Sequence, residues 1–82
     1  MAIEVEDETR KRMVVSIQRY YEQEVEEEIS ALQAGFLLDY FLKEIAPTVY
    51  NQAIADTQAW MLARVEDLEG SLYEAEFDFW KR

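Results

Sequence analysis

The segment from Ser30 to Ala46, SALQAGFLLDYFLKEIA, is the most apolar stretch of this chain. Its apolar residues do not keep to one side of a predicted helix: Leu32 and Phe36 lie along one side, and Leu38 lies toward the opposite side. A helix that is apolar most of the way round is typically a buried helix. The sequence therefore predicts a buried central helix over residues 31–45, with the flanking segments packed on it.

The length and composition restrict the class of protein. The chain has 82 residues, with no cysteine and no histidine. We expect a single domain over 1–82, which would bury only roughly 60% of its unfolded surface and would need tight helix packing or self-association. Without histidine, the chain lacks the commonest metal ligand and the side chain best suited to acid–base catalysis near neutral pH. We therefore expect a non-enzymatic protein with no cofactor and no metal.

The charge is strongly acidic, with eight Lys and Arg against eighteen Asp and Glu and a net charge of −10. Such a surface repels phosphate backbones, which argues against nucleic-acid binding. It would attract a basic protein partner, although solubility alone is the simpler interpretation. No signal peptide is recognisable, and no stretch approaches the roughly 20 apolar residues of a membrane span. We expect a cytoplasmic protein that does not bind a membrane.

The N-terminal residues leave two interpretations open. Residues 3–6 alternate between apolar and acidic side chains, which is a strand period. A short strand before two helices is typical of ribbon-helix-helix DNA binders, but here the outward-facing residues, Glu4 and Glu6, are acidic. We favour a stub in which Ile3 and Val5 pack on the helices.

A first helix is predicted over residues 7–28. The acids Glu6, Asp7 and Glu8 suit the positive end of a helix dipole. Apolar residues then recur at spacings of three and four: Met13, Ile17, Tyr20, Tyr21, Val25 and Ile29. The glutamate run that follows, from Glu22 to Glu28, is unfavourable at a helix C-terminus and favourable before an N-terminus, so we expect the break near Glu28.

Two short polar patterns lie on either side of this break. Ser30 followed by Gln33 is a capping-box pattern, which marks the start of the second helix. The basic triplet Arg10-Lys11-Arg12 is preceded by acids at the favoured spacing for ion pairs, Asp7 to Lys11 and Glu8 to Arg12. We expect that triplet to be a solvated helix face.

Asp39 is the one carboxylate within the apolar stretch FLLDYFL. Its burial would be costly without solvent, a charged partner or a donor. We expect an ion pair with Lys43, four residues on. A polar contact across an interface and a catalytic role are the alternatives.

A third helix is predicted over residues 47–69, or longer to about 80. Pro47 disfavours helix in the residue before it and suits a first helical turn, so a short turn at Ala46-Pro47 would make the second and third helices antiparallel. Leu68 and Leu72 belong to its apolar stripe, and Trp60 and Arg64 lie on an adjoining line. Beyond Gly70 the chain also alternates with a strand period, so residues 70–82 stay open between helix, strand and disorder.

The length of this helix predicts self-association. A helix from Pro47 to Trp80 would be about 50 Å long, whereas a compact domain of this size has a radius of gyration near about 12 Å. Its end would overhang its own subunit, unless it breaks at Gly70. The fold class we expect is all-α, with three helices, a buried central helix and a long third helix, packed as an intertwined homodimer.

The segments IQRYYEQEVEEEIS, LQAGFLLDYFLKEI, PTVYNQAIAD and ARVEDLEGSLYEAE together resemble a family of small bacterial proteins known only as a domain of unknown function (number 2164). The resemblance covers about residues 3–76. The family pattern appears here as Tyr50, Asn51 and Asp56, whereas Ala46 replaces the usual glycine before the proline. The resemblance implies a bacterial cytosolic setting and no activity. The three matching residues fit a structural polar cluster, an interface or, least well, catalysis.

Three classes of function follow. We favour a non-enzymatic protein that forms a homodimer and acts through protein–protein interaction. The alternative is an acidic, antitoxin-like antagonist that occupies a basic protein site, with salt-dependent binding. The third is a carboxylate metal protein or enzyme using Asp39, Asp56, Glu66 and Asp67. The candidate interface or polar-cluster residues are Asp39, Tyr50, Asn51, Asp56, Trp60, Arg64, Leu68 and Leu72.

Overall fold

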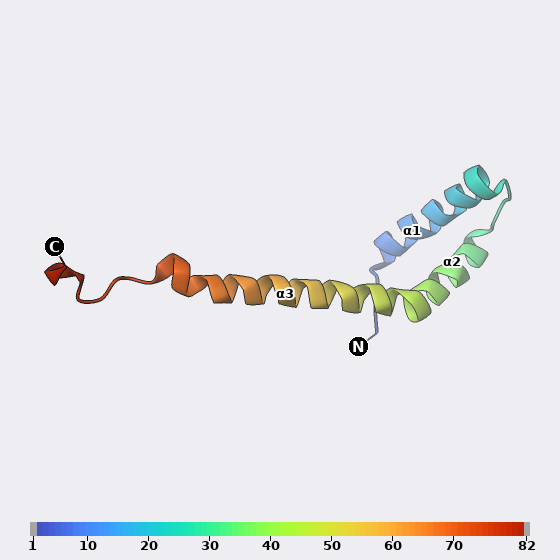
Figure 1. Ribbon diagram of the computed structural model, residues 1–82. Coiled ribbons are helices and arrows are strands. Elements are labelled where there is room, and N and C mark those ends of the chain that lie inside the picture. The colour runs from blue at the N-terminus through green and yellow to red at the C-terminus, as the bar shows by residue number, and fades with distance from the viewer. Residues whose placement is uncertain (1, 82) are drawn as a thin grey trace. The chain divides into compact units, whose positions relative to one another are not determined.

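The computed structural model describes residues 2–81, which are predominantly helical and contain no strand (Figure 1). The elements in chain order are α1 (Asp7–Tyr20), η1 (Tyr21–Val25), α2 (Ala31–Tyr40), η2 (Phe41–Ile45), α3 (Ala46–Leu72) and η3 (Asp78–Trp80). The η1 and η2 segments are single π-helical turns, and η3 is a 3₁₀ turn. The prediction of an all-α protein is confirmed. Within the described part, no helix combines the length and the apolar character that crossing a membrane requires.

The chain divides into two units, Met1–Tyr50 and Asn51–Arg82, and each is described by itself. In the first unit α1 packs beside α2 as a helical hairpin (Figure 1). The second unit holds the rest of α3 and the segment that follows it. The prediction of a single domain stays a prediction.

The first helical stretch ends at Val25, three residues before the predicted end. Glu26 adopts the left-handed conformation, with φ 61° and ψ 34°. Its backbone N–H donates to the carbonyl of Tyr21, and the N–H of Glu27 donates to the same oxygen at 3.2 Å. A left-handed residue of this kind is a common way to end a helix, although glycine usually occupies it. The residues from 26 to 30 then form the loop of the hairpin.

The start of α2 is where the sequence predicted it. The Ser30 side chain accepts a hydrogen bond from the Gln33 backbone N–H at 3.1 Å, and the Gln33 side chain accepts one from the Ser30 N–H at 3.2 Å. Both halves of the capping box are therefore formed. They satisfy two of the backbone donors that an isolated helix N-terminus leaves without partners.

The predicted turn at Ala46-Pro47 is wrong, and with it the reason for expecting antiparallel second and third helices. The backbone is helical at every residue from 31 to 72, so two helical stretches replace the three predicted. In a regular helix the ring of Pro47 would clash with the carbonyl four residues earlier. Here the preceding turn is a wider π turn, in which the Ala46 N–H donates to the carbonyl of Phe41. A π bulge is a recognised way to adjust a helix around such a residue.

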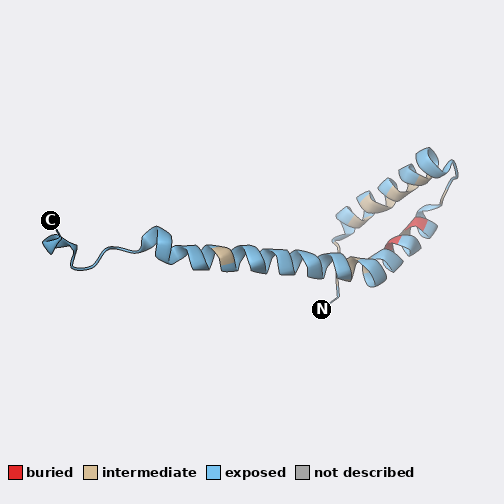
Figure 2. Ribbon diagram, viewed as in Figure 1, coloured by how far each residue is buried: buried red, intermediate tan, exposed pale blue. Residues whose placement is uncertain are grey.

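The central helix is not buried as predicted. Only two of its residues, Ala34 at 0% and Leu38 at 5% exposure, are buried, and they are the only buried residues in the described part of the chain (Figure 2). Leu32 and Phe36 are exposed. The hairpin gives α2 one neighbour, α1, and one neighbour covers one side of a helix. The remaining apolar sides of α2 have no cover within this unit.

In the second unit the helix continues through Gly70 and ends at Leu72, between the two predicted ends. An added methyl group at Gly70 would meet nothing within 4 Å, so this glycine lies at an open position. Residues 73–77 are not helical, and Phe77 has a left-handed conformation with φ 55°. The strand alternative for this segment is wrong, because the described residues there form a bend and the η3 turn.

Candidate functional site

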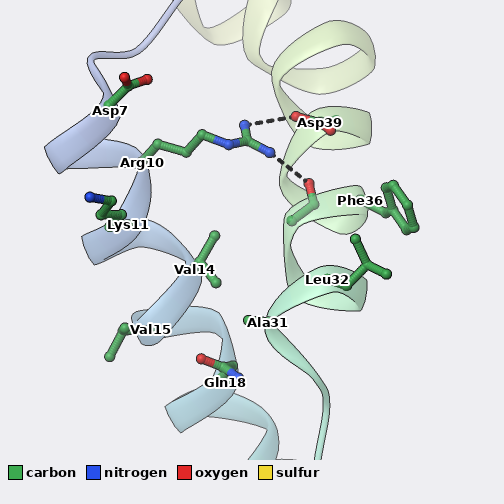
Figure 3. Close-up of a pocket in the computed structure, with 11 residues that line it drawn as sticks. Asp7, Arg10, Lys11, Val14, Val15, Gln18, Ala31, Leu32, Phe36 and Asp39 are labelled. Atoms are coloured by element: carbon green, nitrogen blue, oxygen red, sulfur yellow. Dashed lines mark hydrogen bonds and ion pairs between the residues drawn. The ribbon is translucent and has the colours of Figure 1, made fainter.

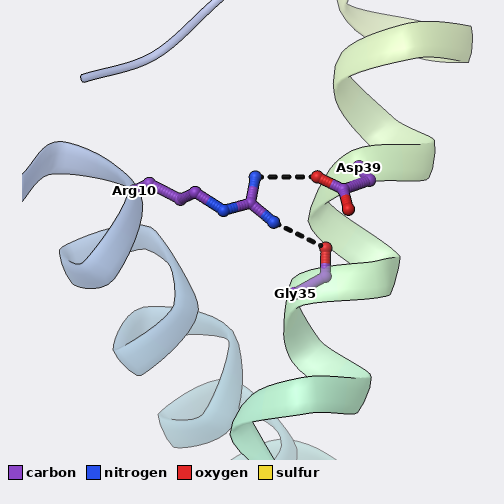
Figure 4. Close-up of polar contacts among 3 residues, drawn as sticks. All are labelled: Arg10, Gly35 and Asp39. Atoms are coloured by element: carbon purple, nitrogen blue, oxygen red, sulfur yellow. Dashed lines mark hydrogen bonds and ion pairs between the residues drawn. The ribbon is translucent and has the colours of Figure 1, made fainter. Parts of the chain in front are cut away.

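The best-defined polar contact of the hairpin joins Arg10 of α1 to α2 (Figure 4). One guanidinium nitrogen, Nη1, lies 2.7 Å from Oδ1 of Asp39. The other, Nη2, donates to the backbone carbonyl of Gly35 at 3.2 Å. The planar guanidinium thus spans a side chain and a backbone group, a geometry that the single ammonium of lysine does not reproduce.

This contact corrects two predictions. Asp39 pairs with Arg10 rather than with Lys43, and Arg10 is directed at α2 rather than at solvent. Lys11 remains on the solvated side, where its ammonium lies 3.2 Å from Glu8 instead of pairing with Asp7. Pair rules based on helical spacing apply within one helix, so they could not anticipate a pair that forms between α1 and α2.

A polar-rimmed groove of about 570 Å³ lies over this contact, between α1 and α2 (Figure 3). Arg10 and Asp39 lie at one end, and Gln18 lies nearer the loop end, where its amide donates to the Ile29 carbonyl at 3.1 Å. Apolar side chains lie between them. The full lining is Asp7, Arg10, Lys11, Val14, Val15, Gln18, Ala31, Leu32, Gly35, Phe36 and Asp39.

A second groove, of about 470 Å³, is also formed by residues of the hairpin unit. We call it the apolar groove. Its lining contains no Asp, Glu, Lys or Arg and consists of Met13, Ser16, Ile17, Leu37, Leu38, Tyr40, Phe41, Leu42 and Ile45. The sequence showed an apolar stripe on each of the first two predicted helices. The groove forms only where these two helices pack side by side. Sequence reasoning therefore missed it.

The candidate residues of α3 are placed along an exposed helix. Asp56 accepts a hydrogen bond from the Gln52 amide at 2.8 Å, a pairing between residues four apart on α3. The Arg64 guanidinium lies 5.0 Å from the centre of the Trp60 ring, within the range of a cation–π interaction. Tyr50, Asn51, Leu68 and Leu72 are exposed. An interface role for this set remains a prediction.

The carboxylates do not gather into an evident metal centre. In residues 2–81 no group of three or more acidic side chains is placed to hold a metal ion. Asp39 has the guanidinium of Arg10 as its partner, and Asp56 has the amide of Gln52. Neither contact has the arrangement of a nucleophile and its base.

The comparisons with known proteins include a family model that matches most of the chain. The model of a family described as uncharacterized conserved protein (DUF2164) matches residues 3–76, as the resemblance in the sequence predicted. No curated protein and no solved structure matches the chain.

Proposed function

The chain belongs to the uncharacterised family DUF2164, and we propose that it is a non-enzymatic protein that self-associates through apolar helix surfaces and acts by protein–protein interaction. The observation that carries this proposal is the exposure of α3 in the second unit. From Asn51 to Leu72 every residue except Ala63 is exposed. The apolar residues among them include Ile54, Trp60, Met61, Leu62, Val65, Leu68 and Leu72.

A helix of this kind needs a covering partner. Most of the stability of a protein helix comes from packing an apolar face rather than from helix propensity. Contiguous exposed apolar surface commonly marks an interaction site. The segment from Asn51 to Leu72 supplies the surface, and among the described residues of the second unit the only other helical element is the short η3 turn, Asp78–Trp80.

The charges of α3 favour a second copy as that partner. The chain as a whole carries a net charge of −10, which would oppose association of two copies. In residues 46–65, however, the charged residues are one acid, Asp56, and one base, Arg64. This part of α3 is therefore neutral overall, and two copies of it can approach without net repulsion, whereas Glu66, Asp67 and Glu69 make the part that follows acidic.

Native mass spectrometry combined with sedimentation at several concentrations tests the proposal. We expect a dimer in the native spectrum and a sedimentation coefficient that rises with concentration. Leu62→Glu places a charge on the apolar surface and should shift the equilibrium to monomer. Ala53→Glu adds the same charge at an exposed position nine residues earlier, which is two and a half turns and so on the opposite side of α3 from Leu62, and it serves as the matched control. A wild-type chain that stays monomeric at every concentration would contradict the proposal.

We also consider a second candidate function, in which this acidic protein occupies a basic site on another protein. The glutamates at the loop end of the hairpin favour it. Glu22, Glu24, Glu26, Glu27 and Glu28 are all exposed there, and the ion pairs of the described residues involve none of them. Titration with a lysine-rich peptide at low and high salt tests this candidate. We expect steep salt dependence and loss of binding when the five glutamates become glutamine. Binding that is insensitive to salt would contradict it.

A further inference from the structure

We propose that two copies of α3 pair side by side, parallel and in register, along one narrow line of the helix that we call the α3 seam. This inference rests on the proposed self-association and deepens it, because it specifies the contact face, the direction of the partner helix and the charges that select it. The residues of the seam, all of them exposed, are Ile54, Thr57, Met61, Val65, Leu68 and Leu72.

The seam has an eleven-residue repeat. Each of its first three residues is followed by another seam residue eleven positions later: Ile54 by Val65, Thr57 by Leu68, and Met61 by Leu72. Three turns in eleven residues correspond to about 3.67 residues per turn, close to the 3.6 of a regular α-helix. All six residues therefore stay within about 40° of Met61 around the helix. A line this narrow matches a single partner helix, as in a coiled coil.

Two charged residues lie along the edges of the seam, one on each side. Arg64 is three residues after Met61, which places it about 60° from Met61 around the helix. Glu69 is eight residues after Met61, about 80° away in the opposite direction. Both are exposed, and neither takes part in the ion pairs of the described residues. The seam thus has one basic edge and one acidic edge.

The other three charges between residues 51 and 72 lie away from the seam. Asp56, Glu66 and Asp67 are each about 120° or more from Met61 around the helix. They would point away from a helix packed on the seam, where solvent and salt screen their repulsion. The acidic charge of the second repeat is therefore compatible with pairing along this line.

The two edges decide the direction of the partner. In a parallel, in-register pair the two-fold axis runs along the helices, so the basic edge of each copy faces the acidic edge of the other. Arg64 and Glu69 then hold the two flanking positions, conventionally g and e, whose ion pairs set partner choice and orientation in coiled coils. In an antiparallel pair each edge faces the same edge of the other copy, and this ion pair does not form.

A second copy of α3 meets both requirements of the seam. It has the same repeat, so the seam residues stay opposite one another along the whole pair, and it presents its charges in the complementary order. A wholly basic partner helix would meet repulsion from Arg64, and a wholly acidic one would meet repulsion from Glu69. Complementary charges of this kind suppress wrong partners and fix the register.

The first test exchanges the charges at the edges and leaves the seam unchanged. Arg64→Glu makes both edges acidic and Glu69→Arg makes both edges basic, so each alone should weaken the dimer about fivefold or more, as expected when two exposed ion pairs are lost. Mixed together, they should form heterodimers in preference to either homodimer, and native mass spectrometry separates the species by mass. The double variant should regain most of the wild-type affinity.

The matched control for this test is Glu66→Arg, which makes the same change of charge at an exposed position away from the seam. It should not weaken the dimer, and it should show no preference for Arg64→Glu as its partner. Sedimentation measures the dissociation constants, and circular dichroism shows whether each variant keeps its helix content.

The second test measures the direction of the helices. The chain has no cysteine, so Ile54→Cys and Leu68→Cys each introduce a single thiol into the seam. In a parallel, in-register pair each thiol lies opposite its own counterpart, and both variants should form disulfide-linked dimers under mild oxidation. The two positions are about 21 Å apart along the helix, whereas a disulfide needs Cα atoms within about 7 Å of each other. An antiparallel pair would therefore link through at most one of them. Ala59→Cys, about 160° from Met61, is the control that should not link.

The outcomes separate this inference from the proposed function. Heterodimer preference, together with disulfides at both seam positions and none at Ala59, is the expected result. A wild-type dimer with no heterodimer preference, or with a disulfide at only one seam position or at neither, would overturn the parallel pairing and leave self-association standing. A wild-type chain that stays monomeric at every concentration would overturn both.

Discussion

Arg10 and Asp39 join α1 to α2 through a 2.7 Å contact between Nη1 and Oδ1, while the second guanidinium nitrogen donates to the Gly35 carbonyl. The contact is partly solvated, with 34% of the Arg10 side chain and 58% of the Asp39 side chain exposed. Ion pairs of such exposure contribute modestly to stability, although they fix how two elements meet. Arg10 therefore acts mainly to set the register of the hairpin.

Replacing Asp39 by Asn should lower the free energy of unfolding by about 0.5–1 kcal/mol, since the pair is exposed and salt screens it. Urea denaturation at low salt measures the change, and the effect should shrink at high salt. Glu66→Gln is the control with the same change of charge, because Glu66 is exposed within α3 and takes no part in the ion pairs of the described residues. Equal effects of the two variants would contradict a specific role for the pair between helices.

Replacing Ser30 by Ala should lower the free energy of unfolding by about 1 kcal/mol, because it removes the acceptor for the Gln33 N–H at the start of α2. Thermal denaturation followed by circular dichroism measures the change. Ser71→Ala, at an exposed position inside α3, is the control and should be neutral or slightly stabilising. Unchanged stability in Ser30→Ala would show that the capping box contributes nothing.

Replacing Glu26 by Gly should stabilise the hairpin by about 0.5–1 kcal/mol. Glu26 has φ 61°, a conformation that glycine adopts without the steric cost that other residues have. Glu24→Gly removes the same charge at a helical position two residues earlier and should destabilise by about 1 kcal/mol. Opposite signs in chemical denaturation are the expected result, and a destabilised Glu26→Gly would refute the role of the left-handed residue.

Replacing Leu38 by Ala should lower the free energy of unfolding by about 2–3 kcal/mol, toward the low end for buried leucines because this core is small. Leu32→Ala, at a leucine of the same helix that is 68% exposed, should cost less than about 1 kcal/mol. Urea denaturation measures both. Comparable losses would mean that Leu32 is covered in solution by a partner.

Local signals in the sequence predicted local structure well. The Ser30–Gln33 capping box predicted the start of α2 to the residue, and the apolar periodicity predicted the helical segments from residue 7 to residue 69. The family was recognisable from the order of its segments. Each of these features depends on residues within a few positions of one another, or on the order of segments along the chain.

The errors arose where two helices meet or where the backbone departs from the regular α form. The rule that proline ends a helix failed at Pro47, because a π turn precedes it. The burial of the central helix was overestimated, because an apolar sequence shows that a surface needs cover but not which element supplies it. The partner of Asp39 was missed for a similar reason, since Arg10 comes from the other helix of the hairpin.

The loop between Val25 and Ala31, which ends at the capping box of α2, also affects how the protein should fold. It brings together two helices that adjoin in the sequence, and domains dominated by such nearby contacts fold in microseconds to milliseconds. The proposed dimer, in contrast, would form at a rate that depends on concentration. Refolding should therefore show two kinetic phases, a rapid one that is independent of dilution and a slower one that dilution delays. The hairpin would then be assembled before the second copy arrives.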